Sequence, residues 1–430
     1  MANKNLSNAK NAKNDEFYTQ LNDIQAEVNA YIDYDPDVFR GKTVLLPCDD
    51  PEWSNFTLFF AQNFERLGLK KLISTSYAPE SKTAKYGSLF EYAASQNDET
   101  PKNERGKIFV LDHDVNANGR IDFEDLEWDY LKGDGDFRSD EVCQLRDEAD
   151  IIVTNPPFLM FREFLAWILE GKCCQCENVA NTSANAQLGT GDIGTGNNST
   201  FSHSTKKFLI IGNMNAITYK EVFPLIKENK AWLGATGFMS DMVFRVPEWM
   251  EIAPADRAKA ARLGYAGNYT RLGNSCWFTN LEHGRRHQPL QLMTMAQNIK
   301  HSKHKEVRGV GYRKYDNYDA IEVPFTDAIP SDYDGVMGVP ISFLDKYCPD
   351  QFEIVGATQR GCHDELPDTK KYDGYWEMTQ DGKRTGASGG KTNENANLEM
   401  NDGKKNYFIN KDGHIVQSAY QRIFIRRKVK

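Results

Sequence analysis

The chain has 430 residues, of which 40% are hydrophobic, and it carries a formal net charge of −9 and eight cysteines. A chain of this length can bury a substantial core and is long enough for two domains. No apolar run approaches the length of a membrane span, and the polar N-terminus lacks the apolar core of a signal peptide. These features exclude a membrane protein and a disulfide-rich secreted scaffold, so we expect a cytoplasmic protein with reduced thiols.

The first half of the chain alternates strand-like with helix-like segments. Residues 43–50 are an apolar run that leads into an acidic turn, and residues 53–67 carry apolar side chains at helical spacing and end at Gly68. Such alternation predicts an α/β fold with a mostly parallel, Rossmann-like sheet. The other predicted strands lie at residues 71–77, 107–111, 150–154, 207–213, 232–238 and 276–280, and the other helices at residues 159–169 and 217–227.

Changes in composition predict the domain organisation. Residues 171–206 are rich in Asn, Thr, Ser and Gly, which indicates a flexible surface insertion. Beyond about residue 245 the regular alternation stops, and Tyr, Asp, Pro and Gly become more frequent. We therefore predict one domain over residues 1–245, with the insertion at 171–206, and a second domain over residues 246–430 that chooses the substrate.

The most informative motif is the tetrapeptide Asn155-Pro156-Pro157-Phe158. It follows a β-branched run that is typical of a buried strand, and prolines can only lie where such a strand ends. In open α/β sheets ligands bind at the carboxyl ends of the strands. The tetrapeptide is similar to the (Asn/Asp/Ser)-Pro-Pro-aromatic signature of methyltransferases that act on an exocyclic or amide nitrogen. The alternative is a strand-to-helix turn that happens to contain two prolines.

This tetrapeptide suits the chemistry of an adenine N6 amine, which is a poor nucleophile because its lone pair is delocalised into the ring. Two acceptors can localise the lone pair on nitrogen, and the Asn155 side-chain oxygen and the Pro156 carbonyl are suitable. Phe158 can stack on a base that has been flipped out of a duplex.

Two acidic turns are candidates for binding the cofactor S-adenosylmethionine. Asp49 and Asp50 directly follow the first predicted strand and can accept from amino acid or ribose groups. Asp134 and Asp136 precede the strand that leads to the tetrapeptide and can accept from the adenine amine, with Phe137 against the ring. The alternative for each pair is an ordinary acidic turn.

A third motif resembles the twelve-residue calcium loop of EF-hands. It has oxygen ligands at the expected spacing and a central Gly119, but a strand-like segment precedes it instead of a helix. A structural Ca²⁺ is therefore one interpretation, and a plain Asn-Gly turn is the other. The candidate ligands are Asp114, Asn116, Asn118, Asp122 and Asp125.

Although the net charge of the chain is acidic, basic residues are concentrated in a cluster in its second half. Such a cluster can bind phosphates, and the alternative is a solvated charged face. The cluster consists of Lys300, Lys303, Lys305, Arg308, Arg313 and Lys314.

Taken together, these motifs make the chain resemble the EcoRI-type adenine-specific DNA methyltransferases of restriction–modification systems. The resemblance runs through most of the chain and is more specific than the tetrapeptide alone. At the position of Asp49 and Asp50, most DNA methyltransferases carry a Phe-x-Gly-x-Gly turn instead. The segments that carry the resemblance are 15–20, 48–51, 54–56, 133–139, 154–158, 217–223, 314–321 and 334–340.

The resemblance implies a catalytic domain over residues 1–245 and a target-recognition domain over residues 246–430. It implies transfer of a methyl group from S-adenosylmethionine to adenine N6 in double-stranded DNA, with Phe17, Tyr18 and Thr19 helping to close the cofactor pocket. Two alternatives stay open at this point. One is an enzyme that methylates RNA or a protein glutamine amide, and the other is a non-catalytic protein that binds DNA or calcium.

Overall fold

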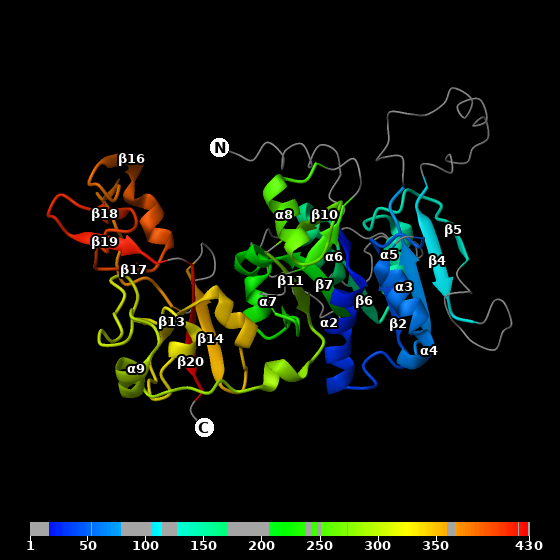
Figure 1. Ribbon diagram of the computed structural model, residues 1–430, viewed down its shortest axis with the longest axis horizontal. Helices are drawn as coiled ribbons and strands as arrows, with labels where there is room; N and C mark the ends of the chain where they lie inside the picture. The colour runs from blue at the N-terminus through cyan, green and yellow to red at the C-terminus, as the bar shows by residue number, and fades with distance from the viewer. Residues whose placement is uncertain are drawn as a thin grey trace, which may run out of the picture. The chain divides into compact units, whose positions relative to one another are not determined.

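The computed structural model describes residues 17–52, 54–78, 105–113, 127–169, 206–237, 242–246, 251–272, 274–358, 366–419 and 421–428. They form two compact units (Figure 1). The first lies within Met1–Asn213 and Met239–Leu281, and the second within Met214–Phe238 and Glu282–Lys430. The chain thus passes between the units more than once, whereas the sequence predicted a single boundary after residue 245.

The first unit is built on a mixed sheet. In spatial order its strands are β5 (Trp128–Tyr130), β4 (Lys107–Leu111), β3 (Lys71–Thr75), β2 (Thr43–Leu46), β6 (Ile151–Thr154), β7 (Lys207–Asn213) and β11 (Ser275–Thr279). The centre is parallel, since β2 pairs with β3 and β6, and β6 pairs with β7, in the same direction. The outer strands β4, β5 and β11 are antiparallel to their partners, so the prediction of a mostly parallel sheet was too simple.

The burial of β2, β6 and β4 is consistent with their directions. Every residue of β2 and β6 is buried, as expected for parallel strands that are covered on both faces. In β4, by contrast, buried residues alternate with less buried ones, and Val110 is 36% exposed. Alternation of this kind is typical of antiparallel strands with one face toward water.

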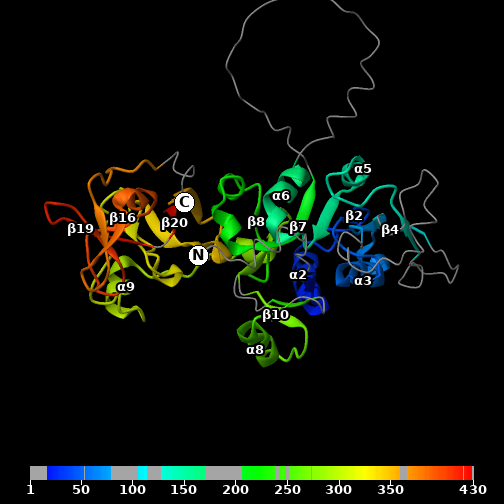
Figure 2. The same cartoon turned by 90° about the horizontal axis from the view of Figure 1, so that it is seen from above.

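Helices cover both faces of this sheet. Figure 2 shows α5 (Asp140–Glu148) and α6 (Phe161–Leu169) on one face and α2 (Leu21–Tyr34) and α3 (Asn55–Gln62) on the other. The side chain of Ser54 caps α3 by accepting a hydrogen bond from the backbone N–H of Phe56. The short α4 (Phe64–Leu67) ends at Gly68, whose φ of 62° is the left-handed conformation that glycine adopts most readily.

A small antiparallel sheet brings the N-terminal segment into the first unit. Its order is β1 (Tyr18–Thr19), β9 (Val243–Arg245) and β10 (Tyr269–Arg271), and α8 (Pro254–Arg262) contacts β10. Tyr18 pairs with Arg245 and Thr19 with Phe244. This pairing fixes the position of Phe17, the residue immediately before β1.

The second unit contains two further sheets. The first sheet contains a buried ion pair. The Arg422 guanidinium lies 2.6 Å from the Glu322 carboxylate, and the two side chains are 11% and 9% exposed. That sheet has the order β12 (Ile321–Glu322), β13 (Met337–Pro340), β20 (Arg422–Arg427) and β14 (Phe352–Ala357). The other sheet has the order β16 (Arg384–Ser388), β15 (Trp376–Met378), β18 (Tyr407–Ile409), β19 (Ile415–Ser418) and β17 (Asn397–Leu398). Other elements of this unit are α7 (Phe223–Lys227), β8 (Trp232–Leu233) and α9 (Met295–His301).

Candidate active site

The carboxyl ends of β2 and β6 meet at a switch in strand order. From β2 the sheet continues to β3 on one side, and from β6 it continues to β7 on the other. Ligands of open α/β sheets bind outside the carboxyl ends of strands at such a switch. Asp49 follows β2 and Asn155 follows β6, so the structure brings together two of the sites that the sequence predicted.

A direct hydrogen bond joins these two strand ends. The Asp49 carboxyl is buried, and its Oδ2 accepts from the Thr154 hydroxyl at 2.6 Å. Its Oδ1 accepts from the Ser54 hydroxyl at 2.7 Å. Burial raises the pKa of Asp49 to about 7, although the bonds from Thr154 and Ser54 act to lower it. Asp49 therefore changes its charge near neutral pH.

Asn155 is oriented by the N-terminal segment. Its side-chain Nδ2 donates to the Phe17 carbonyl oxygen at 2.6 Å, and because a carbonyl can only accept, this bond fixes which way the amide points. The other amide atom, Oδ1, is buried and has no hydrogen-bond partner among the described residues. Leaving a buried polar atom unpaired costs about 1–3 kcal/mol, so the site favours a ligand that brings a donor to this oxygen.

Three aromatic rings from distant parts of the chain gather beside Asn155. Phe158 stacks on Phe17, with ring centroids 5.5 Å apart and an angle of 19° between the planes. Phe244 on β9 meets both rings edge-on, at 5.9 Å from Phe17 and 6.3 Å from Phe158. Phe158 is thus held in a packed aromatic environment that defines its ring plane.

The other residues of the segment 17–19 and of the tetrapeptide support this arrangement. The Thr19 carbonyl accepts from the Asn55 side chain at 2.7 Å, which connects β1 to the start of α3. Pro156 is buried, and the Pro157 carbonyl accepts from the Met160 N–H at 2.9 Å, which turns the chain toward α6. Tyr18 belongs to β1 and is only half-buried.

The second acidic turn lies beside the end of β3. The Asp134 carbonyl accepts from the Ala78 N–H at 2.7 Å, and Gly135, with a φ of 79°, allows the loop to approach Ser76 closely. Asp136 is engaged by Arg138, whose Nη2 lies 2.7 Å from its carboxylate.

Phe137 and Asp50 lie in different surroundings. Phe137 is 5% exposed and packs against Phe164 and Trp167 of α6, with centroids 5.1 and 5.6 Å away. Asp50 is less buried than Asp49, and its Oδ2 lies 3.6 Å from the Lys107 ammonium.

The predicted basic cluster is exposed in the second unit. It begins at the end of α9 and continues toward β12, and one member, Lys303, forms an ion pair of 2.8 Å with Asp327. All six side chains belong to exposed residues: Lys300, Lys303, Lys305, Arg308, Arg313 and Lys314.

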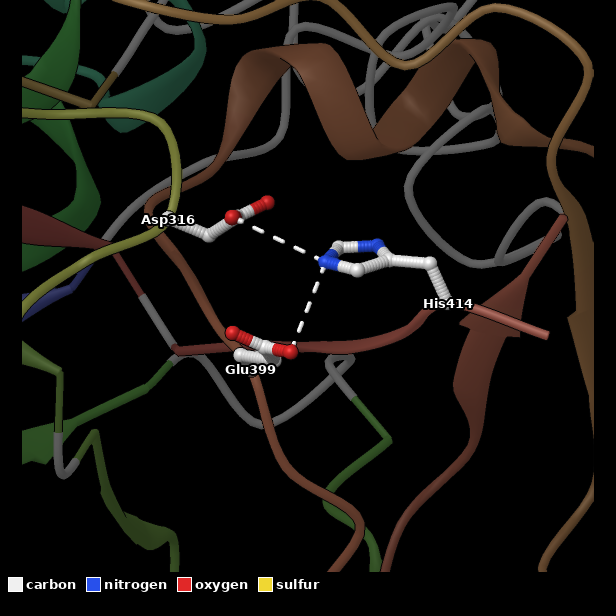
Figure 3. A group of neighbouring side chains, drawn as sticks. All are labelled: Asp316, Glu399 and His414. Carbon is white, nitrogen blue, oxygen red and sulfur yellow. Dashed lines mark ion pairs between the residues drawn. The ribbon is translucent and has the colours of Figure 1, made fainter. Parts of the chain in front are cut away.

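A group of titratable side chains in the second unit, shown in Figure 3, was not predicted from the sequence. His414 lies with its Nε2 3.8 Å from both Asp316 and Glu399. A metal ion would need these three ligands, but Lys370 already lies 3.0 and 2.9 Å from the two Asp316 oxygens. The Lys370 ammonium balances the charge of Asp316, so the group is explained by ion pairing.

Several site residues had weak signals or none in the sequence. Ser54 and Asn55 lay within a segment that carried the family resemblance, but no role was predicted for them. Thr154 also lay within such a segment, 154–158, but it resembles an ordinary strand residue and no role was predicted for it. Phe244 was not predicted, because it reaches the site only through the β1–β9 pairing. The five candidate calcium ligands, from Asp114 to Asp125, lie outside the described residues, so the calcium loop stays a prediction.

Comparison with known proteins identifies the family. The family described as "Adenine-specific methyltransferase EcoRI" matches residues 5–173 and 199–428 of the chain. The chain belongs to this family. It is similar to Type II methyltransferase M.EcoRI of Escherichia coli, with 40% identity over 360 residues that cover 82% of this chain and 89% of the relative. Type II methyltransferase M.MpnI of Mycoplasma pneumoniae is 31% identical over 350 residues, which cover 81% of this chain and 84% of that protein.

A third relative is Type II methyltransferase M.MgeORF184P of Mycoplasma genitalium, which is 30% identical over 351 residues that cover 81% of this chain and 85% of the relative. Membership of the family confirms the sequence-based prediction of an adenine-specific methyltransferase. No solved structure matches the chain. Among the described residues, none of the helices combines the length and the apolar character that crossing a membrane requires.

Proposed function

We propose that the chain transfers a methyl group to the N6 amine of an adenine that is flipped out of double-stranded DNA, as the modification enzyme of a restriction–modification system. The buried Asn155 Oδ1, which has no partner among the described residues, carries this proposal. Because the Phe17 carbonyl already takes up the amide nitrogen, the free group is an acceptor. An exocyclic amine is the donor that an isolated acceptor of this kind would bind.

The residues of the chain hold the amine and the base. Asn155 Oδ1 and the Pro156 carbonyl accept its two hydrogens, which localises the lone pair on nitrogen and directs it away from the ring. Phe158, supported by Phe17 and Phe244, stacks on the base and recovers part of the few kcal/mol that flipping costs. The amine loses its proton to solvent after transfer, so the site needs no general base and acts by positioning and electrostatics.

S-adenosylmethionine, when bound, supplies an electrophilic methyl group on a sulfonium. The donor set of this cofactor consists of an ammonium, ribose hydroxyls and an adenine amine, and carboxylate acceptors match it. Asp50 lies in the turn after β2, and the hydrogen bond from the Ala78 N–H to the Asp134 carbonyl holds the Asp134 loop beside the end of β3, so both residues are near the strand ends where a Rossmann-like sheet would bind it. We assign these two carboxylates to the cofactor, with Asp136 held by Arg138 and Phe137 supporting the loop from the core.

The second unit would provide target recognition. Its exposed basic cluster, from Lys300 to Lys314, can neutralise backbone phosphates, which contributes affinity without sequence information. The arginines of β20 form ion pairs with acidic residues, so we assign them a structural role and not a role in phosphate binding. They are Arg422, Arg426 and Arg427.

The test is incorporation of label from tritiated S-adenosylmethionine into duplex DNA, RNA and protein. We expect label in the N6 position of adenine in duplex DNA. Asn155→Ala should lower this incorporation by about a hundredfold or more, since it removes an interaction made to the reacting atom. Asn401→Ala, which changes an exposed asparagine of the second unit, is the matched control. Label in RNA or in a protein amide, or full activity of Asn155→Ala, would overturn the proposal.

A further inference from the structure

The hydrogen bond between Asp49 and Thr154 crosses the switch point immediately beside the catalytic tetrapeptide. Thr154 is the last residue of β6, and Asn155 follows it directly. The Thr154 hydroxyl is fully buried and donates to Asp49 Oδ2 at 2.6 Å. A change in the orientation of Thr154 therefore changes the direction in which Asn155 leaves the strand.

Both the backbone and the side chain of Asp49 form hydrogen bonds within the protein. Its N–H donates to the Thr75 carbonyl at 3.0 Å, and its carbonyl accepts from the Ser74 hydroxyl at 2.6 Å, both on the neighbouring strand β3. Its Oδ1 accepts from Ser54, the residue that caps α3. The backbone of Asp49 thus ties the turn after β2 to β3, while its carboxyl connects that turn to the start of α3 and the end of β6.

We propose that Asp49 is a positioning residue for methyl transfer, which acts through Thr154 to fix the start of the catalytic tetrapeptide relative to the turn after β2. This inference rests on the proposed function, and it gives Asp49 a different role from the direct cofactor contact that its place in the sequence predicted. Both of its carboxylate oxygens are engaged inside the protein, whereas Asp50 is the more exposed member of the pair.

The charge of Asp49 determines how well it can do this. As a carboxylate it accepts from both hydroxyls, but a proton on Oδ2 would compete with Thr154 for the same oxygen. Burial places its pKa at about 7, so the two-acceptor form increases as the pH rises through neutrality. The titratable neighbours on the same turn are Cys48 and Asp50, and burial together with the charge of Asp49 raises the pKa of Cys48 far above the neutral range.

The experiment compares kcat, the KM for S-adenosylmethionine and the KM for duplex DNA in four variants of the full chain, one of which is Asp49→Asn. Thr154→Val removes the hydroxyl with little change in shape, and Thr154→Ser keeps it. Thr279→Val is the matched control, because it removes an equally buried hydroxyl from the end of β11, where Thr279 donates to the Phe208 carbonyl. Circular dichroism melting of each variant separates lost activity from lost stability.

We expect Thr154→Val to lower kcat on the order of ten- to a hundredfold, as for a hydrogen bond to a charged group, with a smaller change in either KM. Thr154→Ser should restore kcat to within about threefold, and Thr279→Val should keep it. Wild-type kcat should rise with pH between about pH 6 and 8, and Asp49→Asn should be slow with a flat profile.

Several results would overturn the inference. They are wild-type kcat in Thr154→Val, failure of Thr154→Ser to restore it, or equal losses of activity and melting temperature in Thr154→Val and Thr279→Val. If Thr154→Val does not fold, Asp49→Asn decides, because an unchanged kcat and pH profile in that isosteric variant contradict the inference. These outcomes leave the proposed function intact as long as Asn155→Ala is inactive.

Discussion

The buried Asp49 carboxyl makes the stability of the cofactor-free protein depend on pH in a direction that can be measured. Its pKa is raised from 3.8 to about 7 in the folded protein. The raised value means that folding favours the neutral form. Its contribution to stability is therefore fully present below about pH 4 and is lost as the pH rises to about 7.

The magnitude follows from proton linkage. Between about pH 5 and 7 the folded protein retains a proton on Asp49 that the unfolded chain has lost, so the free energy of unfolding falls by about 1.4 kcal/mol per pH unit. Over this interval Asp49 alone accounts for about 2–3 kcal/mol, as an order of magnitude. Asp23, whose pKa burial raises to about 6, acts in the same direction, so the total slope of the wild type is not attributable to one group.

The difference between the wild type and Asp49→Asn isolates the Asp49 contribution. Urea denaturation at several pH values from 5 to 8 would measure it, with Asp33→Asn, an exposed position on α2, as the control. We expect Asp49→Asn to gain stability relative to the wild type as the pH rises. For Asp33→Asn, the curve of the free energy of unfolding against pH should remain parallel to that of the wild type. Parallel curves for Asp49→Asn and the wild type would refute the reasoning.

Two further predictions concern substrate binding. Phe17→Ala removes the ring that stacks on Phe158 but keeps the backbone carbonyl that orients Asn155, so we expect kcat/KM for duplex DNA to fall about tenfold. Steady-state methylation, with 2-aminopurine fluorescence to follow base flipping, would check this, and an unchanged kcat/KM contradicts it. In the basic cluster, Lys305→Gln with Arg308→Gln should reduce the slope of log affinity against log salt by about 1 for each phosphate that is no longer neutralised. Lys42→Gln, in the first unit, should leave the slope measured by fluorescence anisotropy unchanged, and an equal effect of the two changes would argue against phosphate binding by the cluster.

The sequence predicted several strands well because each is a local signal. The runs at 107–111 and 207–213 have the bounds of β4 and β7, since each contains a short run of mostly apolar residues. The direction of β4 could not be predicted, because pairing is a property of two distant segments. The predicted helix over 217–227 is divided, with α7 beginning only at Phe223, and Pro224 lies at its first turn, where proline is well accommodated.

Helix α2 shows a local signal that was missed. Ile24, Val28 and Tyr31 are fully buried on one face, at the spacing of an amphipathic helix. The pattern follows directly after the N-terminal motif and would have predicted the helix. It also explains how residues 17–19 are anchored to the first unit.

The geometry of the candidate active site was only partly predictable from the sequence. The position of Asn155 at the end of a buried strand followed from the sequence, because prolines end strands. The acceptor that orients it did not, because the Phe17 carbonyl reaches Asn155 through the pairing of β1 with β9, more than two hundred residues further along the chain. Phe244 arrives by the same pairing. No local pattern encodes a contact of that kind.

The atom that orients Asn155 belongs to the backbone, and this affects how the site can be read from related sequences. Any amino acid at position 17 would present the same carbonyl oxygen, so an alignment would show no constraint from this hydrogen bond. The constraint falls instead on the residues that keep β1 beside β9, and above all on the length of chain between Phe17 and α2. A one-residue insertion or deletion there would shift the register and move a different carbonyl opposite Asn155. For this hydrogen bond, the spacing of residues near the N-terminus of a related sequence is therefore a better guide than residue identity at position 17.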